Sequence, residues 1–258
     1  MINCVNERAI STNQTEAQID KCCESTIEVA YRNIKRDHVF NVGLDLLIRN
    51  RNHFTKGIKI TREGAFGYSG TFRDVADGAD YVRTLATLYP IDTARIVLAG
   101  HSAGGQLALW LASRHSLDRT SPLFGGTPMP VRGVVSVGGI ADLREFYGRE
   151  RNTCGNPAVE SLLGGIPDSV PARLRDASPI ERLPLGVPSV HIAGDRDFIA
   201  PVAVREAYVT AATARGDKAR VVTIVGDGHF EAMTPYKAAG RAVIDAIRGL
   251  LDLPPSTP

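Results

Sequence analysis

A serine stands in the segment Gly100-His101-Ser102-Ala103-Gly104, with a glycine two residues away on either side. It follows a short apolar run at 95–99 and precedes an apolar stretch at 103–114, which read as a strand and a helix. The pattern G-x-S-x-G at such a junction puts the serine on a strained turn, where small neighbours let the backbone approach closely. The alternative is a glycine-rich turn with an incidental serine. The strand-to-helix context favours a nucleophile.

An activated serine needs a base to take its proton. His229 lies in the glycine-flanked segment Gly226-Asp227-Gly228-His229-Phe230, just past the apolar run at 220–225. Of the six histidines, only His229 and His101, which is next to the serine, lie in a glycine-flanked segment at the end of an expected strand. His191 falls inside an expected strand and is assigned to the core. His229 is therefore the candidate base.

The base in turn needs a carboxylate to orient it. Two candidates, Asp195 and Asp197, follow the apolar run at 189–193. Asp195 could instead shape the turn through hydrogen bonds from its side chain to the backbone. Asp197 lies four residues before Pro201, which can open the next helix. Asp197 is preferred, with Asp195 as the competing reading.

Alternating strands and helices must place these three residues together. Such an alternation predicts an α/β protein with a mainly parallel, doubly wound sheet and helices on both faces. Chemistry in such sheets sits at the carboxyl ends of the strands. Expected strands lie at 95–99, 131–137, 189–193 and 220–225, and expected helices at 71–86, 103–114, 201–215 and 238–251.

The bulk composition leaves the function open but excludes some classes. The 258 residues include 30 basic and 28 acidic side chains, so the net charge favours neither nucleic acid nor a membrane surface as partner. No apolar stretch approaches the ~18 residues of a membrane span, and the N-terminus lacks the apolar region of a signal peptide. The four cysteines have neither metal-ligand nor disulfide-framework spacing. We expect a cytoplasmic protein; nothing indicates its oligomeric state.

The composition changes near residue 60. None of the 15 prolines and only two of the 25 glycines precede residue 61. We therefore expect a divergent N-terminal segment at 1–60, a main domain at 61–252 and a tail at 253–258. Within the first segment, the capping-box pair Thr15 and Gln18 predicts a helix over 15–34, and apolar alternation predicts a strand over 42–48.

Several stretches resemble the α/β-hydrolases, in which Ser, Asp and His also follow this chain order. More narrowly, the chain resembles the bacterial esterase and kynurenine-formamidase-like (arylformamidase-like) group over roughly 61–252. The matching stretches include GYSGTFRDVADGADYVRTLA, GHSAGGQLALWLASR, VRGVVSVGGIADL, ASPIERLPLGVP, HIAGDRDFIAP and GDGHFEAM. The resemblance implies a serine hydrolase acting on a small-molecule ester or amide.

The resemblance also implies roles for particular residues. Ser102 is the nucleophile, Asp197 the acid and His229 the base, and the backbone N–H of Ala103 is one oxyanion donor. No metal and no organic cofactor is required. A short cap-like region is expected at about 140–188. Residues that could contact substrate are His101, Phe146, Tyr147 and Phe230, with surface packing as the alternative for Phe146 and Tyr147.

One departure from the family pattern bears on activity. Members of the group carry an early His-Gly-Gly-type loop whose amide supplies a second oxyanion donor, and no His-Gly-Gly occurs in this sequence. His38 and His53 are followed by Val39 and Phe54. The N-terminal part of the sheet is therefore expected to be missing or replaced. Losing one oxyanion donor costs a factor of ~10²–10³ in rate.

Three hypotheses follow. The first is a serine hydrolase that cleaves a carboxylic ester or an aryl formamide through an acyl-enzyme. The second is a catalytically impaired remnant of such an enzyme that acts as a binding scaffold, which the missing oxyanion loop motivates. The third is an S9-like peptidase. Those enzymes bring a large gating domain that 258 residues do not accommodate.

Overall fold

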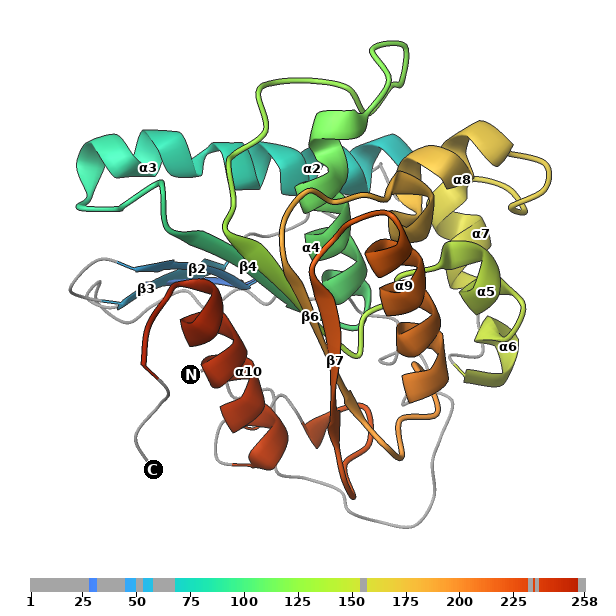
Figure 1. The fold of residues 1–258 in the computed structure, drawn as a ribbon. Helices are drawn as coiled ribbons and strands as arrows, with labels where there is room; N and C mark the ends of the chain where they lie inside the picture. The colour runs from blue at the N-terminus through green and yellow to red at the C-terminus, as the bar shows by residue number, and fades with distance from the viewer. Residues whose placement is uncertain are drawn as a thin grey trace, which may run out of the picture.

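A seven-stranded sheet runs through the protein, with helices on both of its faces (Figure 1). The computed structural model describes residues 68–153, 157–231, 234 and 237–254, and the backbone of residues 28–31, 45–49 and 53–57. The strands are β1 (Glu28–Tyr31), β2 (Asp45–Arg49), β3 (His53–Gly57), β4 (Ile96–His101), β5 (Gly133–Val137), β6 (Ser189–Gly194) and β7 (Ala219–Ile224). The α-helices are α2 (Tyr68–Asp80), α3 (Val82–Leu88), α4 (Ala103–Ser113), α5 (Leu143–Tyr147), α6 (Glu150–Thr153), α7 (Ala158–Leu163), α8 (Pro171–Ala177), α9 (Val202–Ala214) and α10 (Ala238–Leu250).

The strands β4, β5, β6 and β7 form the parallel half of the sheet, in that order. Each of the four lies within two residues of its expected range, and the helices α4, α9 and α10 do as well. The apolar runs identified these strands because β4, β5 and β6 are covered on both faces. The helix expected at 71–86 begins earlier and is divided at Tyr81 into α2 and α3.

The other half of the sheet is antiparallel. The strand order is β1-β3-β2-β4, and β2 pairs antiparallel with the central strand β4 through partners such as Leu46 and Leu98. The strand expected at 42–48 is thus present as β2. The helix expected over 15–34 is wrong at Glu28–Tyr31, which pairs with β3 as a strand. There the β-forming residues Val29 and Tyr31 prevail over the helical pattern; the rest of that expected helix lies outside the described residues.

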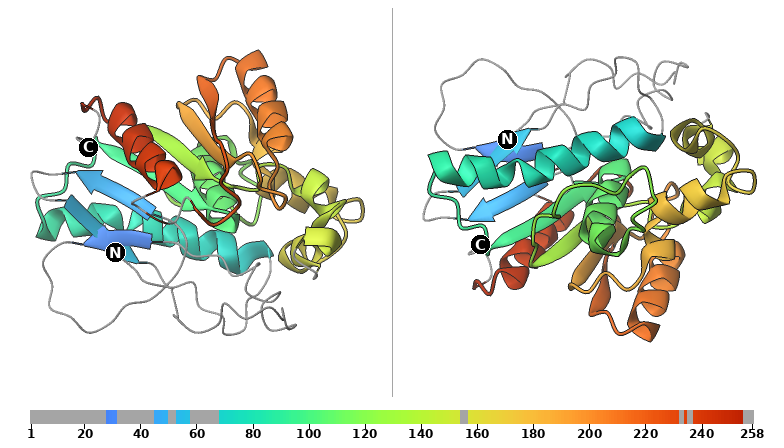
Figure 2. Two further views of the ribbon diagram at one scale, coloured as in Figure 1. Left: turned by 90° about the horizontal axis from the view of Figure 1, so that it is seen from below. Right: turned by 90° about the horizontal axis from the view of Figure 1, so that it is seen from above.

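Two apolar cores hold the helices against the sheet. Alternate side chains of β4 point to opposite faces, so Ile96 and Leu98 lie in one core while Val97 and Ala99 lie in the other. The first core also contains buried residues of α2, α4, α8 and α9. The second is closed mainly by α10, which packs across β4, β5 and β6 (Figure 2). The helix that follows Ser102 thus belongs to the first core, and the second core supports the opposite face of the sheet.

The contact between α2 and α4 provides a test of the larger core. Phe72 of α2 is fully buried, and its ring centroid lies 4.6 Å from that of Trp110 in α4. We expect Phe72→Ala to lower the free energy of unfolding by about 3–5 kcal/mol, because it removes a buried ring and leaves a cavity. Urea denaturation measures this change. Leu88→Ala, at a side chain that is 67% exposed, is the control and should change stability by less than about 0.5 kcal/mol.

Candidate active site

Ser102 occupies a strained backbone conformation at the junction between β4 and α4. Its φ is +54° and its ψ is −122°, a combination that L-residues other than glycine rarely adopt. Such strain costs about 1–3 kcal/mol and persists where the surrounding structure enforces it. Here the strand runs directly into the helix: a Cβ atom on Gly100 would lie 2.1 Å from the carbonyl oxygen of Gly104. Glycine at position 100 is what permits this turn.

The neighbouring strand β5 holds the turn in place. The amide of Ser102 donates a hydrogen bond to the Val137 carbonyl at 2.8 Å. Behind it, a Cβ on Gly105 would lie 2.7 Å from the Cα of Gly139 and 2.9 Å from Ser136 Oγ. Small residues are therefore needed on both sides of Ser102, as the sequence pattern predicts.

Asp197 and His229 meet at the carboxyl end of the sheet. Nδ1 of His229 donates to Oδ2 of Asp197 at 2.9 Å, and both side chains are about 1% exposed. Asp197 lies three residues after the end of β6, and His229 lies five residues after the end of β7. A Cβ on Gly194 would lie 2.0 Å from the carbonyl oxygen of Asp227, so the two loops pack directly on each other.

The two candidate carboxylates have different contacts. Asp195 accepts a hydrogen bond from the Gly226 amide at 2.8 Å, which ties the end of β6 to the loop after β7. Asp197 contacts His229, and its other oxygen, Oδ1, accepts from the Ala200 amide at 2.7 Å. Asp195 therefore shapes the turn, and Asp197 is the carboxylate that orients the imidazole.

The hydrogen bond to Asp197 sets the tautomer of His229. Because a carboxylate accepts, Nδ1 carries the proton and Nε2 of the neutral ring has a free lone pair. Nε2 is buried and has no hydrogen-bond partner among the described residues. Ser102 Oγ and His229 Nε2 are therefore not hydrogen-bonded here. In unliganded enzymes such bonds are often long and tighten only when substrate binds.

His101 links the serine to the histidine loop. Its Nε2 lies 2.7 Å from the carbonyl oxygen of His229, and the two imidazole ring centroids are 4.6 Å apart. Burial lowers the pKa of His101 to about 4, and the nearby His229 adds to the shift. His101 is therefore neutral at neutral pH. Because the carbonyl accepts, Nε2 of His101 is its protonated nitrogen.

The charge on Asp197 is decided by two opposing effects. Burial raises the pKa of this carboxyl, while the hydrogen bond and charge of His229, the Ala200 amide and the Arg205 guanidinium lower it. The net pKa is below the usual range, so Asp197 is ionised at neutral pH. A buried carboxylate at this position can stabilise an imidazolium on His229.

The remaining expected contact residues lie in different surroundings. Phe230 is 51% exposed, and its ring lies against His101 and His229. Phe146 is buried in the larger core, with the Arg149 guanidinium 5.1 Å from its ring centroid, and Tyr147 packs against that core at partial exposure.

Only one of the two oxyanion donors expected from the family pattern falls among the described residues. Ala103 opens α4, and the first amides of a helix have no acceptor within it, so its N–H is available beside Ser102. The Gly105 and Gln106 amides both bond the Ser102 carbonyl. The second donor would come from the segment before Tyr68, where only the strands β1, β2 and β3 are described.

Two residues of the site were not identified from the sequence. Arg205 of α9 is fully buried beside Asp197, and Gly138 lies against both Asp197 and His229. A signal for Arg205 existed: it is three residues before Tyr208 and seven before Ala212, on the buried face of its helix. His191 is in the core, as expected, with Nε2 3.1 Å from Ser189 Oγ.

The described residues contain no cluster of three or more His, Cys, Asp or Glu side chains able to hold a metal ion. None of the helices among them is long and apolar enough to cross a membrane.

Solved structures with the same fold include several esterases. A truncated carbohydrate esterase from gut microbiota has a TM-score of 0.60 and 22% identity, covering 72% of this chain and 70% of its own. Esterase B from Lactobacillus rhamnosis, inhibited by a tributyrin phosphonate, has a TM-score of 0.61 and 14% identity over 77% of this chain and 64% of its own. Thermogutta terrifontis esterase 2, phosphorylated by paraoxon, has a TM-score of 0.54 and 19% identity over 73% and 65%.

At these identities the similarity shows a shared fold. No curated protein sequence matches the chain. Residues 61–209, more than half of the chain, match the model of the BD-FAE family. The protein therefore has the α/β-hydrolase fold and belongs to the BD-FAE family.

Proposed function

We propose that this chain is a serine hydrolase that cleaves a small carboxylic ester through an acyl-enzyme. The observation that carries the proposal is the buried Asp197–His229 pair, whose free Nε2 lies in the same cluster of loops as the strained Ser102. A structural ion pair would not need an unpartnered imidazole nitrogen. Leaving one buried costs free energy unless a ligand or a reacting hydroxyl can use it.

The proposed reaction assigns one step to each group. His229 Nε2 takes the proton from Ser102 Oγ as the oxygen attacks the ester carbonyl, and Asp197 stabilises the resulting imidazolium. The Ala103 amide donates to the developing oxyanion. His229 then returns the proton to the leaving alcohol, which departs and leaves an acyl group on Ser102. Water, deprotonated by the same histidine, releases the carboxylic acid and restores the serine.

Support for an ester as substrate comes from two directions. The family match and the esterase neighbours share this fold, and two of those neighbours carry a phosphonate or phosphoryl group from organophosphorus reagents. An aryl formamide is the second candidate substrate, because the sequence resembles the formamidase-like group and the same triad chemistry would cleave it. A formyl-enzyme would then be the intermediate.

A non-catalytic scaffold is the competing function. It is favoured by the absence of a His-Gly-Gly loop from the sequence, since one oxyanion donor would then be missing. A peptidase ranks third. The hydrolase and the scaffold predict different reactivity at Ser102, because an activated serine reacts with a fluorophosphonate whether or not its natural substrate is known.

We expect purified protein to take up one fluorophosphonate group by intact-mass analysis, and Ser102→Ala to abolish both this adduct and the turnover of short aryl esters. Ser69→Ala, at an exposed serine of α2, is the matched control and should label normally. A folded wild-type protein that gains no adduct would instead favour the scaffold. Parallel assays with aryl esters and N-formyl aryl amides distinguish the two substrate classes.

The position of His229 depends on a glycine in the loop after β5. Gly138 has a φ of +55°, and a Cβ there would lie 3.0 Å from Cε1 and 3.1 Å from Nδ1 of His229. It would also lie 3.4 Å from Oδ2 of Asp197. The imidazole therefore packs against bare backbone. Any side chain at position 138 would press on the ring that has to accept the serine proton.

We expect Gly138→Ala to slow fluorophosphonate labelling by a factor of up to about a hundred, the size of effect that follows when a catalytic group is misplaced by about 1 Å. Gly216→Ala is the matched control: Gly216 also has a positive φ, of +92°, but no heavy atom lies within 4 Å of the added Cβ. Both variants should lose about 1–2 kcal/mol of stability from backbone strain. If Gly138→Ala labels as fast as Gly216→Ala, His229 is not held by this contact.

A further inference from the structure

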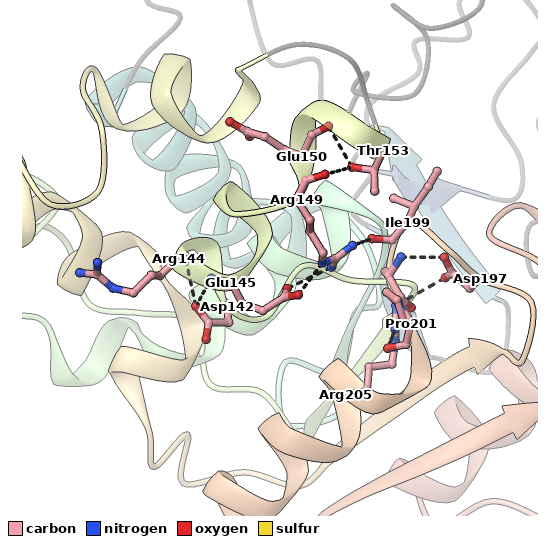
Figure 3. Close-up of polar contacts among 11 residues, drawn as sticks. Asp142, Arg144, Glu145, Arg149, Glu150, Thr153, Asp197, Ile199, Pro201 and Arg205 are labelled. Carbon is pink, nitrogen blue, oxygen red and sulfur yellow. Dashed lines mark hydrogen bonds and ion pairs between the residues drawn. The ribbon is translucent and has the colours of Figure 1, made fainter.

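Two arginines bind the loop that carries the acid Asp197 (Figure 3). Nη1 of Arg205, in α9, donates to the carbonyl oxygens of Ala200 and of Pro201, the latter at 2.9 Å. Arg149, between α5 and α6, donates to the carbonyl oxygen of Ile199. Three successive carbonyls of this loop are thus held by guanidinium groups from two different parts of the chain.

Arg205 is also close to the carboxylate itself. Its Nη2 lies 3.6 Å from Oδ2 of Asp197, the same oxygen that accepts the hydrogen bond from His229. Both side chains are 1% exposed. At this separation in a buried site the two charges attract each other strongly, although the contact is longer than a hydrogen bond.

The charges around Arg205 leave Asp197 as its counter-ion. Arg149 is paired with Glu145, to which it donates from Nε and, at 3.0 Å, from Nη2 (Figure 3). Burial lowers the pKa of Arg205 to about 10, with Asp197 opposing that shift, so the guanidinium remains charged at neutral pH. The imidazole of His191 also faces Arg205, and burial holds its pKa near 3, so it is neutral.

A purely structural role does not account for this arginine. Nε and Nη2 of Arg205 have no hydrogen-bond partner among the described residues, so much of its donor capacity is unused. Burying an unsatisfied cation is costly, and an apolar side chain of similar size would avoid that cost. The positive charge beside Asp197 is the feature that an apolar residue could not supply.

We infer that Arg205 is a positioning residue that holds the Asp197 carboxylate and its loop in place for His229. The inference rests on the proposed function, since Arg205 acts through the proposed triad. Arg205 does not touch the reacting atoms. It fixes the three loop carbonyl positions together with Arg149 and balances the charge of the buried carboxylate, so that Asp197 keeps one oxygen on the Ala200 amide and the other on His229.

The positioning role of Arg205 predicts which way the pH profile of labelling moves when its charge is removed. The groups that lower the pKa of Asp197 are His229, the Ala200 amide and Arg205, and burial acts against them. The acid limb of the pH profile is the pH at which the Asp197–His229 pair takes up a proton and can no longer accept one from Ser102. The positive charge of Arg205 beside the pair opposes that uptake, so removing the charge should move the acid limb to higher pH. The other ionisable groups around the pair are His101, His191, Arg149 and Glu145.

The test compares Arg205→Gln with Arg205→Lys in the full chain, by the rate of fluorophosphonate labelling as a function of pH. We expect Arg205→Gln to label about ten- to a hundredfold more slowly, with its acid limb at higher pH. Arg205→Lys, which keeps the charge, should restore the position of the limb and most of the rate. If Arg205→Gln fails to fold, the limb of Arg205→Lys decides: a wild-type position supports the inference, and a shift to higher pH overturns it.

Arg114→Gln is the matched control. Arg114 is also a buried arginine with a carboxylate partner, Asp80 at 2.8 Å, but it lies at the end of α4 away from the triad. It should lose stability to urea while keeping the wild-type acid limb. An Arg205→Gln protein that is folded and labels at the wild-type rate with an unshifted limb overturns the inference. Equal slowing in the Gln and Lys variants overturns the role of charge.

Proton NMR separates this inference from the proposed function. The Nδ1 proton of His229 shared with Asp197 should give a strongly downfield resonance, which is observed without any substrate. We expect this signal in the wild type and in Arg205→Lys, and its loss in Arg205→Gln. A wild-type protein that shows the resonance but takes no label would contradict the proposed function and leave the role of Arg205 to be decided by the resonance alone.

Discussion

The backbone of Ser102 is the constraint on which the rest of the site depends. A residue with a side chain is held at φ +54° because β4 turns into α4 without an intervening loop. This geometry exists only where Gly100 can touch the Gly104 carbonyl and Gly105 can touch Gly139. The strain of about 1–3 kcal/mol is small compared with the free energy gained by burying the apolar side chains of α4, of which Trp110 and Leu109 are fully enclosed. The core therefore keeps the turn in a conformation that it would not adopt alone, and the serine is presented at the sheet edge.

A second constraint is the burial of charge. Asp197 must remain ionised where water does not reach it. The structure gives it hydrogen-bond donors from its own loop and from the loop after β7, and places the guanidinium charge of α9 beside it. The contacts that keep the carboxylate charged also fix its orientation, so the same neighbours set both the charge and the position of Asp197. Gly138 adds the complementary restriction from β5, because bare backbone at that point leaves room for the imidazole. The ends of three neighbouring strands, β5, β6 and β7, thus place these two side chains.

The parallel half of the fold was predictable because its signals are local. β4, β5 and β6 are covered on both faces and read as continuous apolar runs, and the spacing of Ser102, Asp197 and His229 along them follows from the βαβ alternation. Arg205 was missed because a charged residue in a helix is ordinarily assigned to the solvent-exposed face. Its counter-ion, Asp197, lies eight residues earlier, across a turn. Gly138 was missed because it contributes by having no side chain. That leaves room for the ring of His229, a residue 91 positions later in the chain. β2 and β3 pair over a short separation in sequence, whereas the pairings of β1 with β3 and of β2 with β4 join residues far apart in the chain, which local patterns do not specify.

The parts of the active site differ in where they come from along the chain. The residues proposed as nucleophile, acid and base, the Ala103 amide and the proposed positioning arginine all lie between β4 and the loop after β7, on the parallel half of the sheet. The second oxyanion donor of the formamidase-like pattern belongs to the segment before Tyr68, where this sequence departs from that pattern. The groups proposed to activate the serine and the second oxyanion donor would therefore come from different parts of the chain. A donor lost from the N-terminal segment would reduce the rate of ester turnover by a factor of ~10²–10³. Because the phosphoryl oxygen of a fluorophosphonate also gains negative charge as Ser102 attacks it, the same loss would slow labelling. A serine that labels rapidly would therefore indicate that another donor completes the oxyanion site.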